Sequence, residues 1–201
     1  MASTSSEPAV PYLAPGVTTS VKIVVLGPFA VGKTTFVSSV SEITPLSTEA
    51  LMTERSQGVD ELLGTTNKTT TTTAMDFGRL TLDEEIVLYI FGAPGQSRFS
   101  RFIDGLMVGA LGGVAMVDTR HIDESFESLT RLEKARVPYV VAVNCFPEAP
   151  SYSEPDLREA FDIAENTPLI TCDARYRESA KQPLIALVSH LLYLNSMGAH
   201  P

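Results

Sequence analysis

The segment Val21–Thr34, which reads VKIVVLGPFAVGKT, decides the fold of this chain. Its first six residues are rich in β-branched side chains and almost continuously apolar, a pattern typical of a buried parallel strand. The next eight residues, Gly27–Thr34, match the pattern G-x-x-x-x-G-K-[ST]. Apolar residues then recur at helical spacing from Phe36 to Ile43, until Pro45 ends the pattern. A glycine-containing loop between a strand and a helix is the context in which this pattern binds phosphate groups.

Each part of this loop has a chemical role in that interpretation. Backbone amides of the loop and of the helix start point at the phosphates, because a helix N-terminus carries unsatisfied donors and partial positive charge. The ammonium group of Lys33 reaches the terminal phosphates, and the hydroxyl group of Thr34 can ligate Mg²⁺. We therefore expect the polyphosphate of a nucleotide to contact Gly27, Phe29, Ala30, Val31, Gly32, Lys33, Thr34 and Thr35.

Composition and charge narrow the class of protein. A chain of 201 residues with 44% hydrophobic and 19% charged residues is ordinary for one globular domain. The formal charge of −9 disfavours general attraction to nucleic acid, so we expect no nucleic-acid partner. Cys145 and Cys172 lie outside any C-x-x-C pattern, which argues against a disulfide framework or a zinc site.

The remaining features predict a cytoplasmic protein without direct membrane insertion. The first ten residues lack the basic start and apolar centre of a signal peptide. The most apolar stretch, Gly105–Val117, has only 13 residues and is too short to span a bilayer.

Strand-like and helical patterns alternate along the chain, which predicts an α/β fold with a mainly parallel sheet. We expect residues 1–20 to be a disordered extension, 21–196 to form the nucleotide-binding domain and 197–201 to be a disordered tail. The polar stretch 44–73 is expected to be a mobile or ligand-ordered loop, although its threonines also suit an edge strand. Strands are predicted at 21–26, 74–82, 86–91, 113–117, 139–144 and 169–172, with helical patterns after the glycine loop and around 126–132, 157–164 and 184–194.

Further motifs follow the glycine loop in an ordered set. They are the threonine-rich stretch Thr65–Thr73, Asp76–Phe77, Gly92–Gln96, Asn144–Phe146 and Asp173–Arg175. Over residues 21–195, this order and spacing resembles a Ras-like small GTPase. Within that superfamily the chain is most similar to GTPases of the actinobacterial conservon type, and more distantly to the bacterial gliding-motility polarity GTPases.

The resemblance implies a fold, ligands and partners. The fold is a P-loop NTPase, a Ras-like three-layer sandwich with a six-stranded, mostly parallel sheet flanked by about five helices. The ligands are GTP, GDP and Mg²⁺, and the loops 44–73 and 92–103 act as switches. The partners are a roadblock-type regulator and a sensor-kinase-like membrane protein, so that any association with a membrane runs through a partner.

The resemblance also implies roles for individual residues. Thr72 matches the switch threonine that binds Mg²⁺, with Thr71 and Thr73 as alternatives, because the repeated threonines blur the register. Gly95 and Gln96 match the glycine that contacts the γ-phosphate and the glutamine that orients the attacking water. The catalytic set is then Gln96, Lys33 and Thr72, the metal ligands are Thr34 and Thr72, and further nucleotide contacts come from Gly95, Asn144, Phe146, Asp173, Ala174 and Arg175.

Three positions depart from the pattern of that superfamily. Gly92 stands where an aspartate usually holds Mg²⁺ through water. Phe29 stands where a glycine is frequent, and its bulky ring predicts slow intrinsic hydrolysis. Pro147 stands where an aspartate reads guanine, and Glu148 lies one residue late. These departures leave two alternatives open, a nucleotide-binding scaffold without useful turnover and an ATP-binding P-loop NTPase.

Three charged residues near these motifs have two interpretations each. Asp118 follows an apolar strand like a metal-binding acid, but capping of a turn or helix is favoured. Arg98 and Arg101 lie close to Gln96 and either stabilise charge in cis or are simply solvated.

Overall fold

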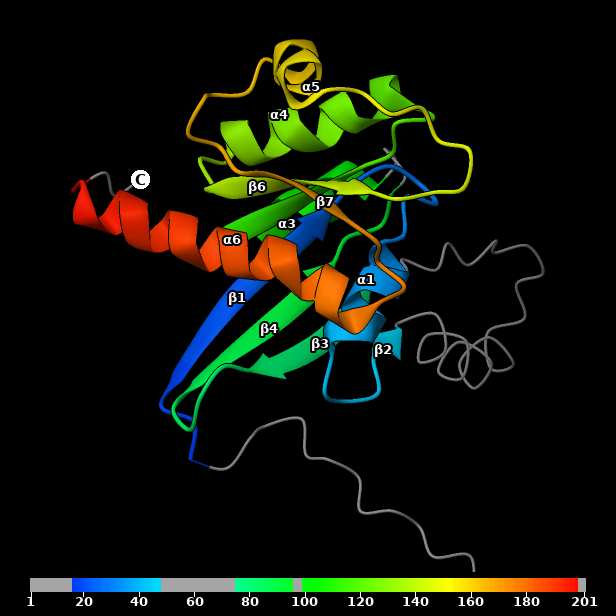
Figure 1. Ribbon diagram of the computed structural model, residues 1–201. Helices are drawn as coiled ribbons and strands as arrows, with labels where there is room; N and C mark the ends of the chain where they lie inside the picture. The colour runs from blue at the N-terminus through cyan, green and yellow to red at the C-terminus, as the bar shows by residue number, and fades with distance from the viewer. Residues whose placement is uncertain (1–15, 48–74, 96–98, 199–201) are drawn as a thin grey trace, which may run out of the picture.

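The computed structural model describes residues 16–47, 75–95 and 99–198. The strands are β1 (Thr19–Leu26), β2 (Leu46–Ser47), β3 (Asp76–Thr81), β4 (Ile86–Gly92), β5 (Gly112–Val117), β6 (Tyr139–Asn144) and β7 (Leu169–Cys172). The helices are α1 (Lys33–Val40), α3 (Ser100–Met107), α4 (Phe126–Lys134), α5 (Glu154–Phe161), α6 (Arg177–Ser196) and the short 3₁₀ helix η2 (Ile122–Ser125). Helices and strands alternate from β4 onward, as Figure 1 shows.

The strands form one sheet in the order β2-β3-β4-β1-β5-β6-β7. β4, β1, β5, β6 and β7 run parallel to one another, whereas β3 and β2 are antiparallel to their neighbours. All six strands predicted from the sequence are present, and the two-residue β2 adds a seventh at the edge of the sheet. The α/β class and the mostly parallel sheet are therefore confirmed.

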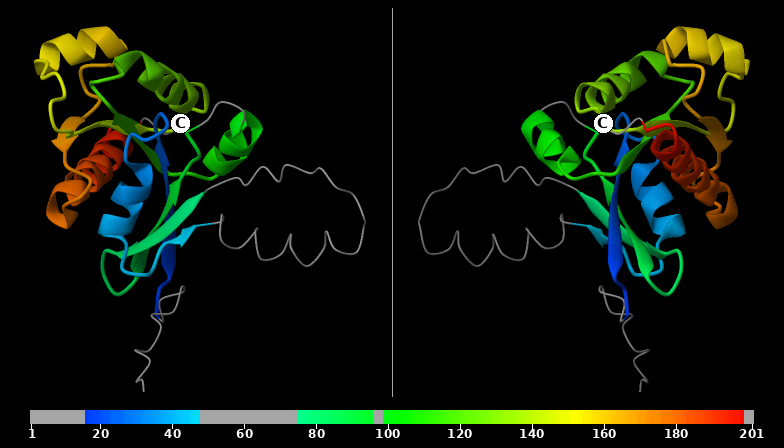
Figure 2. Two further views of the ribbon diagram at one scale, coloured as in Figure 1. Left: turned by 90° about the vertical axis from the view of Figure 1, so that its right-hand side faces the viewer. Right: turned by 90° about the vertical axis from the view of Figure 1, so that its left-hand side faces the viewer.

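Helices cover both faces of the sheet, which gives three layers. In Figure 2, α1 and α6 lie on one side of the sheet and α3 and α4 on the other. Side chains of β1 alternate between the layers, since Ile23 and Val25 pack into the cluster under α1 and α6, while Val24 and Leu26 pack into the cluster under α3, α4 and α5. All four are at most 2% exposed, which explains the unbroken apolar run in the sequence.

Several element boundaries differ from the sequence-based expectations, and two of them change the description of the fold. β1 begins at Thr19 rather than Val21, because Thr19 and Ser20 pair with Ile86 and Val87 of β4. Residues 100–103, expected within a switch loop, form the first turn of α3. Residues 1–15, most of the polar stretch 44–73 and residues 199–201 lie outside the described residues.

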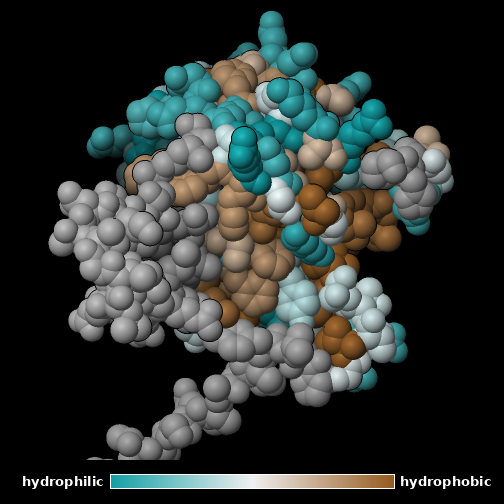
Figure 3. Space-filling model, turned by 180° about the vertical axis from the view of Figure 1, so that it is seen from behind, coloured by the Kyte–Doolittle hydropathy of each residue, from teal (hydrophilic) through white to brown (hydrophobic). Residues whose placement is uncertain are grey.

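A group of aromatic side chains lies on the α3 side of β3 and β4. The Phe77 ring stacks on Tyr89 with centroids 5.7 Å apart and lies 5.1 Å from the Phe91 ring. Lys22 of β1 places its ammonium group 5.5 Å from the centre of the Phe91 ring. All of these side chains are half-buried, and Figure 3, which views the molecule from behind, shows apolar residues gathered on this face. In the described ranges, no helix is both long and apolar enough to cross a membrane.

Candidate nucleotide site

The glycine loop lies between the end of β1 and the start of α1, as the sequence predicts. Its two glycines are required by close approach. A Cβ atom on Gly27 would lie 2.8 Å from the carbonyl oxygen of Met116 on β5. Gly32 has a φ of +101°, and a Cβ atom there would lie 2.7 Å from Nδ2 of Asn144. The loop is therefore wrapped tightly against the carboxyl ends of β5 and β6, where ligands of open α/β sheets bind.

Lys33 is the buried cation of the loop. Its side chain is held by two backbone carbonyl groups, because Nζ donates hydrogen bonds of 2.8 Å to Gly27 and 2.6 Å to Pro28. Burial lowers the pKa of Lys33 to about 8, and the nearby Asp76 carboxylate partly opposes that shift. An ammonium group desolvated in this way binds an approaching phosphate more strongly than a solvated lysine does.

Gly95 brings the segment after β4 against the loop. A Cβ atom on Gly95 would lie 2.7 Å from the backbone nitrogen of Phe29 and 2.8 Å from Nζ of Lys33. Only a glycine fits at this distance without displacing the loop. Gly95 therefore lies beside the ammonium group that is expected to hold the terminal phosphates, and its own contact with the phosphate stays a prediction.

Asp76 is a residue of this site that the sequence analysis did not assign to the metal. Thr34 donates a 2.7 Å hydrogen bond from Oγ1 to Oδ2 of Asp76 at the start of β3. Asp76 is the antiparallel partner of Gly92, and a Cβ atom on Gly92 would lie 3.2 Å from both Cβ and Oδ2 of Asp76. A carboxylate of the neighbouring strand therefore lies beside position 92, where the sequence itself has none.

The pair of Thr34 and Asp76 fits Mg²⁺ in the chemistry of its donors. Mg²⁺ prefers oxygen ligands, keeps several waters and is usually bound through one or two carboxylates together with substrate phosphates. A hydroxyl and a carboxylate at 2.7 Å, next to the phosphate-binding loop, provide such a partial set of ligands.

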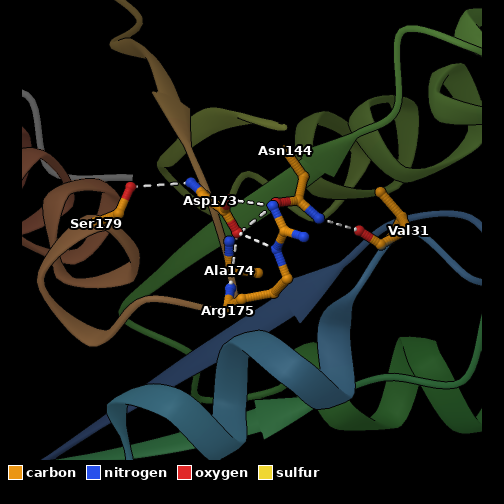
Figure 4. A network of polar contacts seen from close by, with 6 residues as sticks. All are labelled: Val31, Asn144, Asp173, Ala174, Arg175 and Ser179. Carbon is orange, nitrogen blue, oxygen red and sulfur yellow. Dashed lines mark hydrogen bonds and ion pairs between the residues drawn. The ribbon is translucent and has the colours of Figure 1, made fainter. Parts of the chain in front are cut away.

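Asn144 connects the loop to the other end of the site. Its Nδ2 donates a 2.9 Å hydrogen bond to the carbonyl oxygen of Val31, and its Oδ1 accepts a 3.0 Å hydrogen bond from the backbone N–H of Ala174. Figure 4 shows Asn144 between Val31 and the segment Asp173–Arg175. The residue is 5% exposed, so both of its polar groups are satisfied inside the protein.

Asp173 and Arg175 form a fork within the loop after β7. Oδ1 of Asp173 accepts hydrogen bonds from the backbone N–H and Nε of Arg175, and Oδ2 lies 2.6 Å from Nη2 of the same residue. The backbone N–H of Asp173 donates to Oγ of Ser179 on α6. The hydrogen bonds from Arg175 hold the pKa of the Asp173 carboxyl below its ordinary value.

Phe146 lies against a cation that the sequence analysis missed. The guanidinium carbon of Arg120 is 3.7 Å from the centre of the Phe146 ring. The same guanidinium group pairs with Asp118, whose Oδ1 also accepts a 2.9 Å hydrogen bond from the backbone N–H of Arg120. Asp118 therefore stabilises a turn after β5, in agreement with the favoured interpretation. The signal available in the sequence was an acid followed two residues later by an arginine.

The remaining predicted residues are distributed as follows. The Phe29 side chain is 70% exposed, and Ala30 is exposed with a left-handed φ of +60°. Thr35 and Arg101 are also exposed. Thr72 and Gln96, together with Thr71, Thr73 and Arg98, lie outside the described residues, so their assigned roles stay predictions.

The fold and this loop define the chain as a P-loop protein that binds a nucleotide. A family model described as "conserved hypothetical ATP binding protein" matches residues 25–194. Because that match covers most of the chain, the chain belongs to this family. No curated protein gives a significant match.

A solved structure with the same fold is the cytosolic domain of the FeoB iron transporter from T. maritima, in a GDP form. The TM-score is 0.61 at 14% sequence identity, and the alignment covers 86% of this chain. The chain spans 64% of the length of that solved chain, which is less than two thirds. At this low sequence identity, the similarity shows that the two chains share a fold. It does not show that they share an activity or partners.

Proposed function

We propose that this chain is a guanine-nucleotide switch that binds GTP and GDP with Mg²⁺ and hydrolyses GTP slowly. The observation that carries the proposal is the convergence of four groups at one end of the loop. They are the Lys33 ammonium group, the Thr34 hydroxyl, the Asp76 carboxylate and the Gly95 backbone. Phosphoryl transfer depends on positioning and on neutralising charge more than on covalent chemistry by the protein.

Thr34 and Asp76 are the residues of the described chain that would hold Mg²⁺, with Thr72 as the third ligand implied by the resemblance. The metal, when bound, neutralises negative charge on the phosphates. Within the protein, the Thr34 hydroxyl orients toward Asp76 and fixes the carboxylate beside the loop. The absence of an aspartate at position 92 is therefore no argument against nucleotide binding that depends on Mg²⁺.

Slow hydrolysis is supported by the position of Phe29. Phe29 and Gly95 both line a cavity of about 340 Å³ beside the loop. In the proposed switch, Lys33 and the Gly95 amide hold the γ-phosphate, and Gln96 orients the attacking water. The Phe29 ring then narrows the space from which a water molecule or a partner's arginine approaches. Since a missing arginine finger alone lowers turnover by about 10³–10⁵-fold, a low rate without a partner is expected.

The switch elements of this proposal are the segment 44–73, which ends shortly before Asp76, and the segment 92–103, which contains Gly95 and the first turn of α3. Loss of contacts to the γ-phosphate would release both loops, as in other nucleotide switches. The resemblance to GTPases of the conservon type supports a roadblock-type regulator and a sensor-kinase-like membrane protein as partners. On this proposal the chain acts in the cytoplasm and reaches a membrane through such a partner.

A second candidate function is an ATP-binding P-loop NTPase. Two observations favour it, the description of the matching family as ATP binding and Pro147 at the position of the expected guanine-reading aspartate. Both candidates use the same phosphate-binding loop, so they differ only in which purine the far end of the site accepts.

The test is to identify the nucleotide that copurifies with the protein and then to titrate GTP against ATP in magnesium buffer. The proposal expects guanine nucleotide in the purified protein, preference for GTP and slow release of phosphate. Preference for ATP would replace it with the second candidate. Tight binding of GTP without release of phosphate, even in the presence of a regulator, would identify a scaffold instead of a switch.

A further inference from the structure

The two purines differ at the edge that a protein can read. Guanine presents two adjacent donors, N1–H and the exocyclic amino group, whereas adenine presents one donor beside an acceptor. An ionised carboxylate accepts hydrogen bonds only, with about four lone-pair sites, and therefore matches guanine and repels the adenine acceptor. A chain that selects GTP needs such a carboxylate near the segment that follows Asn144.

That segment does not supply a well-placed carboxylate itself. Pro147 has none, and Glu148 is exposed with a left-handed φ of +61° at the surface of its turn. The neighbouring loop after β7 is the other source. β6 and β7 are parallel with Asn144 opposite Cys172, so both loops leave the sheet at the same edge.

Two hydrogen bonds hold these loops side by side. The backbone N–H of Cys145 donates to the carbonyl oxygen of Cys172 at 2.8 Å, and the backbone N–H of Ala174 donates to Oδ1 of Asn144. Asp173 lies between these two contacts in sequence. The backbone that carries its carboxylate is thereby held beside the segment of Asn144, which in turn contacts the glycine loop.

The Asp173 carboxylate is positioned by its surroundings, and its ion-pair partner is an exposed side chain. Its side chain is 17% exposed, and its backbone N–H is fixed by Ser179 of α6. Among the described residues, every hydrogen bond to its carboxylate comes from Arg175, whose side chain is 58% exposed. Because the arginine of this pair is largely in solvent, the pair contributes little net free energy, and a base that offers two donors can replace the Arg175 guanidinium at low cost.

We propose that Asp173 is the carboxylate that selects guanine, accepting hydrogen bonds from N1–H and the exocyclic amino group, in place of the acid absent at Pro147. Arg175 holds the carboxylate in position until the base replaces the guanidinium contacts. This inference rests on the proposed function, since it requires that a nucleotide occupies the loop with its base toward Asn144.

The experiment compares wild type, Asp173→Asn and Glu148→Gln in competition binding with GTP, ATP and xanthosine triphosphate in magnesium buffer. Xanthine carries a carbonyl group where guanine carries the exocyclic amino group, so it pairs with an amide and not with a carboxylate. Asp173→Asn is expected to weaken GTP binding by about 100-fold, since two charge-assisted hydrogen bonds are lost, and to gain affinity for xanthosine triphosphate. Glu148→Gln is expected to leave the wild-type preference unchanged.

Thermal unfolding of each variant without nucleotide serves as the folding control, because asparagine retains the acceptor for the Arg175 backbone N–H. If wild type binds GTP and Asp173→Asn retains it without gaining xanthosine triphosphate, this inference is overturned while the proposed function stands. The same holds if Glu148→Gln shows the exchange of preference. If wild type binds none of the triphosphates, the proposed function itself fails.

Discussion

At the scale of single residues, the buried ammonium group of Lys33 is expected to make nucleotide binding depend on pH. Its pKa of about 8 lies below the ordinary value of 10.5, so the group loses its proton as the pH rises through about 8. Phosphate binds the charged form, and we expect the affinity for GTP to be constant below pH 8 and to fall by about tenfold per pH unit above it. Titrations of GTP at pH values between about 6.5 and 9.5 measure this dependence of the affinity on pH.

The same shift fixes the sign of the effect on stability. The folded state binds fewer protons than the unfolded state between pH 8 and 10.5, so Lys33 makes the ligand-free protein more stable as the pH rises through this window. Lys33→Ala removes this rise in stability. A stability profile with the same rise in wild type and in Lys33→Ala, without nucleotide, would show that another group is responsible.

Asp76 is the residue on which the magnesium dependence is expected to rest. Asp76→Gly removes the acceptor of the Thr34 hydroxyl and should reduce the gain in GTP affinity that Mg²⁺ provides by about 10–100-fold. Gly92→Asp, added to that variant, is expected to restore part of the gain, because position 92 projects into the same space.

The experiment measures the affinity of wild type and each variant for GTP, once with Mg²⁺ and once with a chelator, and compares the two values. Glu84→Gln, an exposed acid in the turn between β3 and β4, is the matched control and should leave the magnesium effect intact. Full magnesium dependence in Asp76→Gly would contradict the assignment.

At the scale of elements, Asn144 ties the end of β6 to the glycine loop and to the loop after β7. Asn144→Ala leaves the Val31 carbonyl oxygen and the Ala174 N–H without their partner inside the protein. We expect the free energy of unfolding to fall by about 2–4 kcal/mol, from two lost buried hydrogen bonds. Urea unfolding measures this change, and Asn195→Ala on the exposed side of α6 is the control. Equal free energies of unfolding for the two variants would show that the hydrogen bonds of Asn144 do not stabilise the fold.

The elements also show what the sequence could predict. The strands were predictable because burial on both faces makes β1 and its parallel neighbours nearly continuous apolar runs. α3 was missed because its buried positions are few, Ile103 and Met107, and Gly105 lies between them. The glycine loop follows from a local pattern and Asn144 from the family resemblance. The contact of Thr34 with Asp76 depends instead on the antiparallel register of β3 and β4, which local patterns do not contain.

At the scale of the whole molecule, a chain with a formal charge of −9 must bind a strongly anionic ligand against its own net charge. The structure places the compensating groups locally, at the end of β1 and the start of α1. On the proposed function, binding therefore depends on the buried Lys33, the loop amides and Mg²⁺, rather than on a broad basic surface. For the same reason, a single lysine is expected to decide whether the nucleotide binds at all.

The most direct test of that claim is the calorimetric titration of GTP, in magnesium buffer, into wild type, Lys33→Ala and Lys181→Ala. Lys181, the control, lies on α6 and forms an ion pair with Glu178. Both residues are far in sequence from the glycine loop. The account predicts saturable binding by wild type and Lys181→Ala, and none by Lys33→Ala. Equal binding by all three proteins, or heat of binding from none of them, would contradict it.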